Sequence, residues 1–337
     1  MTEPTATVGT GPVSLDTVRR AVEAYADNPS AFLALNSGNS YFCVPGLEGV
    51  VVYRESGRYL VQFAGPFAPA ASYRPLLDGF AAHARERRRR VVAIQLQRAD
   101  AVAYREQGFV VNQIGASYAV DLSGFSLRGS KFMQLRNKVS RAVRAGLTVY
   151  EVDQPDWAAR MAKLDAHWLH GKGKHAKPLE FLVGEYGGPM QPYRRLFVGV
   201  QDSKLLGYIS YAPVPGGRPG WLHDLSRRLP EGPPGVSEAI NLTAVEAFRA
   251  EGCRWLHFGF TPFTGLAPDL EVPGASRPFG WLVGQLGRRG AAVYPAATQL
   301  AYKLKWGPQA VIPEYIAFSA RASLRGFLHV FKVSNAL

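Results

Sequence analysis

Two stretches of this chain, far apart in the sequence, repeat the same order of secondary structure. Residues 80–95 and 245–260 each read as the end of an amphipathic helix, a polar turn and a buried strand. Each is preceded by a strand and a proline-containing loop. The identity between them is too low to prove a duplication, but the shared order predicts two similar α+β units. Alternating helices and strands with hairpins indicate that each unit is a mixed sheet flanked by helices.

The repeat suggests how the whole chain divides into units. We expect residues 1–30 to form an N-terminal tail and helix, 31–148 a first unit, and 149–337 a second unit. Hydrophobic spacing predicts helices at 15–25, 75–87, 99–107, 156–170, 236–250 and 279–287. Strands are expected at 49–54, 58–64, 91–96, 109–112, 117–121, 195–201, 204–213, 221–224, 254–259, 299–305 and 312–318.

A strongly basic helix is expected near the end of the first unit. Residues 123–149 contain six basic groups and no acid. Phe132, Leu135, Val139 and Ala142 have helical spacing, with Ser130 placed to cap the helix and Gly146 to end it. The basic residues are Arg128, Lys131, Arg136, Lys138, Arg141 and Arg144. Such a helix face is often merely solvated, but solvated faces usually mix signs, so the missing acids favour an anionic partner such as nucleic acid phosphate or lipid head groups.

The net positive charge of the whole chain favours an anionic partner but does not identify that partner. The formal net charge is +13 over 337 residues. A second basic run covers Arg87 to Arg90, at the end of an expected helix. It could contact phosphate or simply complement the helix C-terminus.

The sequence lacks the patterns that mark several classes of protein and of functional site. Cys43 and Cys253 have no ligand or redox spacing, which fits a reducing compartment. No apolar run approaches the roughly 18 residues needed to cross a bilayer, and residues 1–12 do not resemble a signal peptide. We therefore expect a cytoplasmic protein, at most peripheral on a membrane. His167 and His170 lack a third metal ligand, and no dinucleotide fingerprint, phosphate loop or nucleophile elbow is present, so no metal or cofactor is expected.

Two clusters of polar residues could carry chemistry. Asp224 and Arg227 are expected just past a strand, at the mouth of a loop, where binding groups concentrate. Arginine can bind phosphate or carboxylate bidentately, although a structural Asp–Arg pair is equally compatible. Lys303 and Lys305 are expected on one face of a strand. They could stabilise an oxyanion, or protect an edge strand by charge.

Taken together, these segments resemble the catalytic domain of bacterial phosphatidylglycerol lysyltransferases, the DUF2156 family. The resemblance covers about residues 37–320. In the first half it rests on Gly65-Pro66, Tyr104, Gly108-Phe109, Ile114-Gly115, Asp121-Leu122, Phe125, Gly129, Lys131, Leu135-Arg136-Asn137 and Arg144-Ala145-Gly146. In the second half it rests on Trp168, Glu180-Phe181, Gly184, Asp224 to Arg227, Pro234-Gly235-Val236, Glu238, Phe258 to Pro262 and Lys303 to Trp306.

The resemblance implies a fold and a set of roles. Members of this family have two tandem acetyltransferase-like (GNAT) units, and they esterify an amino acid from aminoacyl-tRNA to a lipid hydroxyl. Asp224 and Arg227 would line the catalytic centre in the second unit, with Lys303 or Lys305 nearby. Arg136 and its helix would lie beside a donor or acceptor phosphate. Phe260 falls in a family motif and is expected to contact substrate. Glu180 and Glu238 are candidates for binding a basic aminoacyl group, although a neutral amino acid is equally compatible.

Some positions depart from the family pattern. Ser237 stands where a methionine is usual, and Glu238 where aspartate is common. The large N-terminal membrane region of the lipid-modifying members has no counterpart, which leaves the acceptor open between phosphatidylglycerol and a small hydroxyl or hydroxylamine metabolite.

The resulting hypothesis is an aminoacyltransferase with aminoacyl-tRNA as co-substrate. Lys131, Arg136, Lys138, Arg141 and Arg144 would bind the tRNA acceptor stem through its phosphates. One alternative is an acyl-CoA-dependent GNAT enzyme, for which the nearest pyrophosphate loop is 62–67, with a proline that removes an amide. Another is a basic binding module without catalysis, for which Asp224 and Lys303 would be dispensable. A third keeps the chemistry and docks the protein peripherally on a membrane.

Overall fold

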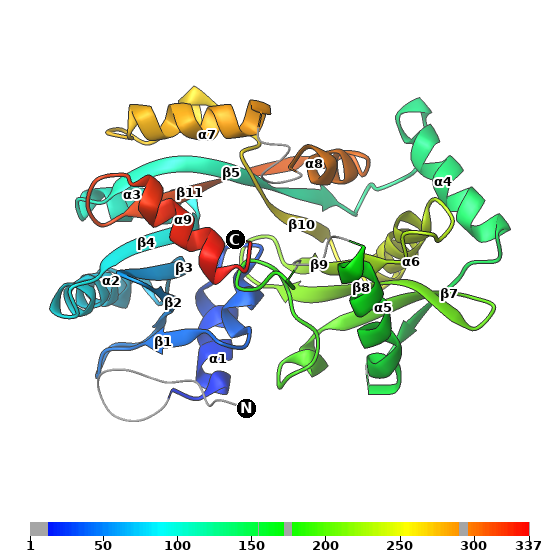
Figure 1. Ribbon diagram of the computed structural model, residues 1–337, viewed down its shortest axis with the longest axis horizontal. Coiled ribbons are helices and arrows are strands. Elements are labelled where there is room, and N and C mark those ends of the chain that lie inside the picture. The colour runs from blue at the N-terminus through cyan, green and yellow to red at the C-terminus, as the bar shows by residue number, and fades with distance from the viewer. Residues whose placement is uncertain (1–12, 154, 172–176, 290–295, 337) are drawn as a thin grey trace.

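One mixed sheet runs through the whole molecule (Figure 1). The structure is a computed structural model that describes residues 13–153, 155–171, 177–289 and 296–336. Within these residues eleven strands form a sheet in the order β1-β2-β3-β4-β11-β5-β10-β9-β8-β7-β6. The long strands β5 and β10 pair in antiparallel fashion and join the two halves. The α+β class, with a mixed sheet flanked by helices, is therefore confirmed.

The elements of the first half alternate largely as expected. They are α1 (Leu15–Tyr25), the 3-10 turn η1 (Ala31–Leu35), β1 (Ser40–Phe42), β2 (Val50–Ser56), β3 (Tyr59–Phe67), α2 (Ala70–Glu86), β4 (Arg90–Leu96), α3 (Arg98–Glu106), β5 (Val110–Asp121), η2 (Ser130–Phe132) and α4 (Met133–Arg144).

The second half begins with another strand and ends with a helix. Its elements are β6 (Thr148–Val152), η3 (Pro155–Trp157), α5 (Ala158–His170), η4 (Gln191–Tyr193), β7 (Arg195–Gln201), β8 (Lys204–Val214), β9 (Gly220–Arg228), α6 (Val236–Ala250), β10 (Trp255–Pro262), η5 (Pro268–Leu270), α7 (Arg277–Arg289), α8 (Ala296–Leu304), β11 (Ala310–Phe318) and α9 (Leu324–Val333).

The repeated helix–turn–strand pattern is present in three dimensions. In the first half β3 and β4 are parallel neighbours joined by α2, and in the second half β9 and β10 are parallel neighbours joined by α6. The C-terminal strand β11 lies between β4 and β5, so the last part of the chain completes the sheet of the first half. The division of the chain at residue 148 remains a prediction.

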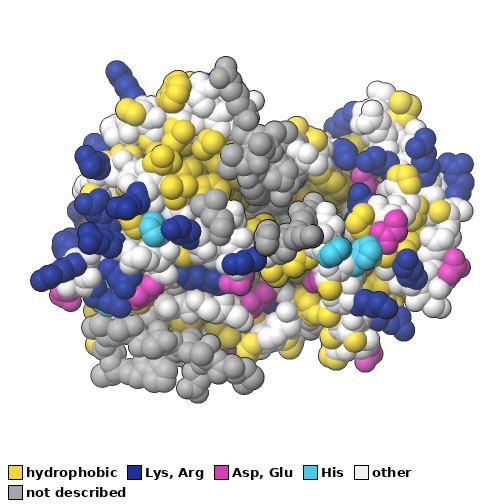
Figure 2. Space-filling model, in the orientation of Figure 1, with side chains coloured by type: hydrophobic (Ala, Val, Ile, Leu, Met, Phe, Trp, Pro, Cys, Tyr) yellow, Lys and Arg dark blue, Asp and Glu magenta, His cyan; other side chains and the backbone are white. Residues whose placement is uncertain are grey.

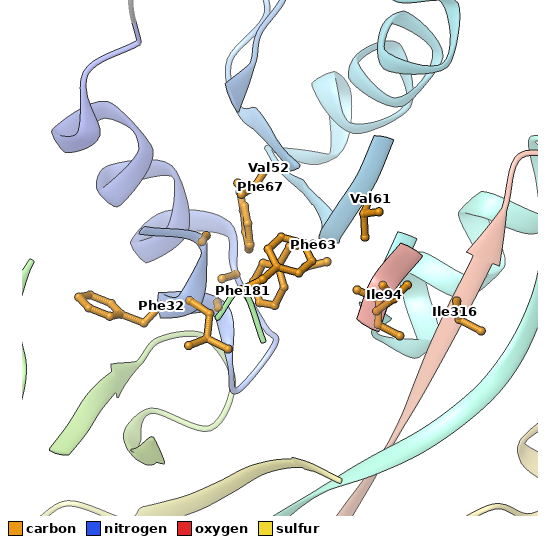
Figure 3. Close-up of a cluster of buried hydrophobic side chains, with 14 of the residues drawn as sticks. Phe32, Val52, Val61, Phe63, Phe67, Ile94, Phe181 and Ile316 are labelled. Carbon is orange, nitrogen blue, oxygen red and sulfur yellow. The ribbon is translucent and has the colours of Figure 1, made fainter. Parts of the chain in front are cut away.

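Apolar side chains from both halves form one core cluster, to which α1, α7 and α9 contribute. Phe63 of β3, Ile94 of β4 and Ile316 of β11 belong to this cluster (Figure 3). The ring of Phe181, from the loop that precedes η4, lies 6.1 Å from that of Phe63, edge to face. This contact anchors a loop of the second half on the sheet of the first half.

The structure corrects several local expectations. Residues 299–305 were expected as a strand, but most of them form α8, so Lys303 and Lys305 do not share a strand face. The period-two spacing of the lysines was misleading, because Tyr302 and Trp306, four residues apart, pack with Phe258 in the core. The strands expected at 109–112 and 117–121 are one strand, β5.

The basic helix begins later than expected. Ser130 lies in η2, and among the described residues no side chain caps the first turn of α4. Gly146 follows the helix with φ +91°, a conformation that favours glycine, as expected for its end.

Candidate active site

A pocket of about 380 Å³ opens where the parallel pair β9 and β10 meets α8. Four of the candidate site residues proposed from the sequence line it: Asp224, Arg227, Phe260 and Lys303. Asp224 and Arg227 lie within β9 rather than in a loop past its end, because that strand continues to Arg228. The first half of the chain contributes Ser30, Leu33 and Gln95 to the same wall. The pocket is therefore built from both halves.

Asp224 lines this pocket and is half-buried. Burial raises its pKa to about 6, although the charge of Arg194 and a hydrogen bond from the backbone amide of Gly184 oppose the rise. Its Oδ2 atom is buried and has no hydrogen-bond partner within the described part of the chain. A Cβ atom at position 184 would lie only 2.0 Å from that oxygen, so glycine is required there. A carboxyl group that titrates near neutral pH is suited to accept a proton.

Arg227 lies at the same pocket and is held against an aromatic ring. Its guanidinium carbon is 4.1 Å from the centre of the Trp168 ring on α5. Nη1 donates a hydrogen bond to the carbonyl oxygen of Ser226, at 2.9 Å. Stacking on an indole restricts the guanidinium plane, which favours bidentate binding of a phosphate or carboxylate.

Lys303 reaches the pocket from α8 with its side chain buried. Nζ donates to the carbonyl oxygens of Gly259 and Phe260, at 2.7 and 3.0 Å. These carbonyls lie at an irregularity of β10, where Gly259 has φ +63°. Burial lowers the pKa of Lys303 to about 7, with the charge of Glu314 acting in the opposite direction. A protonated lysine has three donors, so one remains for a ligand.

Among the pocket residues that were not singled out from the sequence are His223 and Gln95. His223 lies half-buried next to Asp224, and the loss of solvent around its ring and the charge of Lys303 lower its pKa to about 3, so the ring is neutral. Gln95 is the extra residue of a bulge in β4, at φ +59°. Among the described atoms neither polar atom of its side chain has a partner. His223 stands beside Asp224 in the sequence, which was a usable signal, whereas nothing in the local sequence marks Gln95.

Other candidates lie outside the lining formed by the described residues. The carboxylate of Glu238 on α6 accepts from Lys138 and Lys305, at 3.0 and 3.4 Å. Burial alone would raise the pKa of Glu238, but the hydrogen bond from Lys138 and the charges of both lysines lower it. This cluster ties α4 to α6 and to the end of α8.

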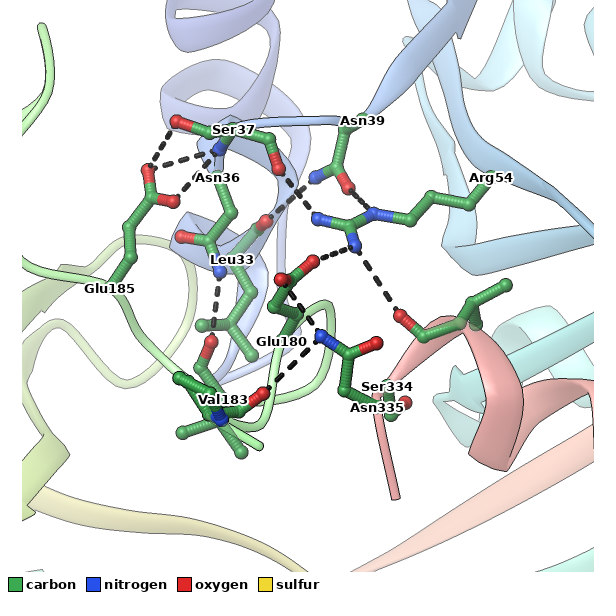
Figure 4. A network of polar contacts seen from close by, with 12 residues as sticks. Leu33, Asn36, Ser37, Asn39, Arg54, Glu180, Val183, Glu185, Ser334 and Asn335 are labelled. Carbon is green, nitrogen blue, oxygen red and sulfur yellow. Dashed lines mark hydrogen bonds and ion pairs between the residues drawn. The ribbon is translucent and has the colours of Figure 1, made fainter. Parts of the chain in front are cut away.

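Glu180 belongs to a polar network between the two halves (Figure 4). Its carboxylate accepts from Arg54 at 2.8 Å and from Asn335 at 2.9 Å. Glu185 accepts hydrogen bonds from Ser37 at 3.0 Å in the same network. These contacts fix the loop that carries Gly184, so they position Asp224 indirectly.

The basic helix α4 lies at one end of the molecule, on the right in Figure 1. Arg141 and Arg144 are exposed, and Lys131 lies 4.7 Å from the ring of Phe132. Arg136 donates to the carbonyl oxygens of Gly129 and Leu127. Figure 2 shows Lys and Arg side chains gathered over this end. The α4 residues form a surface separate from the pocket.

Metal ligands, a pyrophosphate loop and membrane-spanning helices were also considered from the sequence. In the described residues, no three or more His, Cys, Asp or Glu side chains are grouped as a metal site would require. The nearest match to a pyrophosphate loop, 62–67, is buried within β3. None of the helices for which coordinates are described is both long and apolar enough to cross a membrane.

A carboxylate, an arginine and a lysine that converge in one pocket are the groups that an acyl transfer needs. The chain belongs to the family described as phosphatidylglycerol lysyltransferase, C-terminal, whose model matches residues 19–318. The family resemblance expected from the motifs is thereby confirmed.

Curated and solved relatives agree with this assignment. The phosphatidylglycerol lysyltransferase of Bacillus subtilis is 23% identical over 67% of this chain, and a lysylphosphatidylglycerol biosynthesis bifunctional protein of Nocardia farcinica is 31% identical over 42%. The chain spans 26% and 12% of their respective lengths. The C-terminal domain of a lysylphosphatidylglycerol synthetase from Agrobacterium fabrum has the same fold, with a TM-score of 0.77 at 20% identity, covering 96% of this chain and 98% of that one.

Proposed function

We propose that this chain transfers an amino acid from aminoacyl-tRNA to a hydroxyl group of phosphatidylglycerol, or to a small hydroxyl or hydroxylamine acceptor. The observation that carries the proposal is the convergence of Asp224, Arg227 and Lys303 on one pocket. The family and the names of its members support the class of reaction.

The donor ester is already activated, so the pocket needs only to place the acceptor and stabilise charge. The acceptor oxygen attacks the ester carbonyl carbon while its proton passes to the carboxylate of Asp224. Lys303, through its remaining N–H, stabilises the negative oxygen of the tetrahedral intermediate. The bond to the ribose oxygen then breaks, and that oxygen takes the proton back from Asp224. No other reactant is required. In an alternative role, Asp224 orients the α-amine of the donor.

Arg227 would bind a phosphate group or the terminal adenosine of the tRNA. Its guanidinium is restricted by Trp168 and lies at the pocket wall. Placing the donor nucleotide there would set the ester carbonyl between Asp224 and Lys303.

A smaller apolar cavity favours the lipid acceptor over a small metabolite. This cavity, of about 90 Å³, shares Leu179, Leu182, Val183 and Phe260 with the catalytic pocket. Its other lining includes Ile94, Ile114, Phe327 and Phe331. An apolar space beside the reacting groups can take part of an acyl chain, and a polar metabolite gains nothing from it.

The proposed chemistry predicts a bell-shaped pH profile. Asp224 must be ionised to accept a proton, so kcat/KM should rise as pH increases through about 6. Lys303 must be protonated to stabilise the oxyanion, so kcat/KM should fall as pH increases through about 7. Transfer should be measured with spontaneous ester hydrolysis subtracted at each pH. The donor α-amine titrates in a similar range, so an N-acetylated donor serves as the control. A profile that rises steadily to pH 9 would contradict this assignment.

Binding of tRNA through α4 should depend on salt. We expect Arg141→Gln with Arg144→Gln to weaken binding and to lower the slope of log K against log salt by about 1 for each arginine. Fluorescence anisotropy with deacylated tRNA at several salt concentrations measures this. The matched control is Arg20→Gln with Arg74→Gln, two exposed arginines on α1 and α2. Equal slopes for the two double variants would exclude α4 as the tRNA surface.

A further inference from the structure

A second basic surface lies at the opposite end of the sheet from α4. Three segments meet there: the β2–β3 turn, the α2–β4 turn and the chain entering α9. The amide of Arg90 donates to the carbonyl of Arg58 at 2.9 Å, and Arg89 Nη1 donates to the carbonyl of Gly57 at 2.6 Å. Ser319, at the end of β11, donates to the carbonyl of Val91 at 3.0 Å. We call this surface the arginine edge; its exposed members are Arg58, Arg85, Arg87, Arg88, Arg90, Arg321 and Arg325.

Positive charge on the arginine edge is poorly compensated. Residues 55–58, 85–90 and 319–332 contain nine Lys and Arg but two acids, Glu55 and Glu86. The carboxylate of Glu55 is shared by Arg87 and Arg89, at 2.5 and 3.0 Å. Dark-blue side chains accordingly crowd the left of the molecule in Figure 2. A surface that served solubility alone would mix the two signs.

One turn of the arginine edge keeps an arginine where glycine fits better. Arg88 follows α2 with φ +53°. The equivalent turn of the second half, between α6 and β10, has Gly252 at φ +79°. A left-handed conformation is unfavourable for a residue with a Cβ atom. The geometry of the turn does not require an arginine, and the side chain at this position adds another positive charge to the arginine edge.

Exposed apolar side chains lie beside these arginines on α9. Leu324 and Leu328, one helical turn apart, are 56% and 40% exposed. Phe331 continues the same stripe, half-buried, and lines the apolar cavity that adjoins the catalytic pocket. The apolar stripe of α9 therefore ends at the cavity that adjoins the catalytic pocket. Leucines on the outside of a helix flanked by arginines are typical of a helix that lies in a membrane interface.

We propose that the arginine edge, together with Leu324 and Leu328, docks this chain on an anionic lipid surface. The inference rests on the proposed function to the extent that the acceptor is a lipid. Head-group phosphates satisfy the arginines, and the leucines enter the boundary of the acyl chains. An RNA would meet the same charges but would leave the two leucines in contact with phosphate and water. A membrane at this end leaves α4, at the other end, accessible to tRNA.

Vesicle flotation without tRNA tests the docking. We expect the unchanged protein to bind phosphatidylcholine vesicles that contain phosphatidylglycerol and not vesicles of phosphatidylcholine alone, with binding lost at high salt. Each basic residue at such a surface strengthens binding about fivefold, so Arg58→Gln, Arg88→Gln and Arg325→Gln together should weaken it on the order of 100-fold. Leu324→Gln with Leu328→Gln should weaken binding without changing its dependence on salt. The matched control, at the other end of the molecule, neutralises Lys131 of η2 together with Arg141 and Arg144 of α4.

Each result decides the question. A loss confined to the arginine-edge and α9 variants, with unchanged melting temperatures, supports the docking. Equal binding to neutral vesicles, or an equal loss in the α4 control, overturns it. Weakened tRNA binding by the arginine-edge variant, with vesicle binding unchanged, would make the surface a nucleic acid site instead. Transfer to detergent-dispersed phosphatidylglycerol by the unchanged protein tests the lipid acceptor separately, so docking without transfer would leave the docking standing and would refute phosphatidylglycerol as the acceptor.

Discussion

Replacing Asp224 by asparagine is expected to lower kcat/KM for aminoacyl transfer by about 10³-fold, within the range for a lost general base. Asparagine keeps the shape of the side chain but cannot accept the acceptor proton. The measurement is transfer of radiolabelled amino acid from tRNA to phosphatidylglycerol in detergent. Binding of deacylated tRNA should be unchanged, because the contacts proposed for it are made by α4 and Arg227 and not by Asp224.

The same substitution should make the protein more stable at neutral pH. The pKa of Asp224 is raised from 3.8 to about 6 by burial, so above pH 6 the ionised carboxylate destabilises the folded protein relative to the unfolded chain. Removing this charge should raise the free energy of unfolding by on the order of 2 kcal/mol, and the gain should vanish as pH falls below about 4. Lost transfer with gained stability identifies a residue kept for function. Unchanged transfer would remove Asp224 from the mechanism.

Local patterns in the sequence predicted most of the elements because apolar periodicity is a local signal. The spacing of Leu76, Leu77 and Phe80 on α2, and of Ile240, Ala244 and Phe248 on α6, reports burial directly. The position of β11 between β4 and β5 could not be predicted in this way. It depends on pairing between residues about two hundred positions apart, which leaves no trace in local spacing.

The candidate site was only partly accessible from the sequence. Asp224, Arg227, Phe260 and Lys303 come together in one pocket, whereas Lys305 pairs with Glu238 elsewhere. The interpretation of 299–305 as a strand with both lysines on one face failed because the two lysines lie in different surroundings. Lys303 is buried, and its ammonium group donates hydrogen bonds to the carbonyl oxygens of Gly259 and Phe260. Gln95 could not be predicted as a pocket residue from the sequence. Only the folded chain shows that it lies at a bulge and that its side-chain amide has no hydrogen-bond partner among the described atoms.

Lys303→Met is expected to lower kcat by about 10²- to 10³-fold, the usual cost of removing an oxyanion donor. Methionine has a similar length and no donor, so it fills the space in α8 and leaves the tetrahedral intermediate without its stabilising N–H. KM for the donor should change little, because the interaction strengthens only as charge develops on the carbonyl oxygen.

The pH profile separates this role from a merely structural one. Burial lowers the pKa of Lys303 to about 7, so in the unchanged protein the falling limb of kcat/KM reports deprotonation of that ammonium. With methionine at position 303 the residual activity should lose its falling limb and keep the rising limb of Asp224 near pH 6. Circular dichroism and the melting temperature show whether the variant is folded. If the falling limb persists with the N-acetylated donor, another group titrates there, and Lys303 supports the Gly259 bulge rather than the oxyanion.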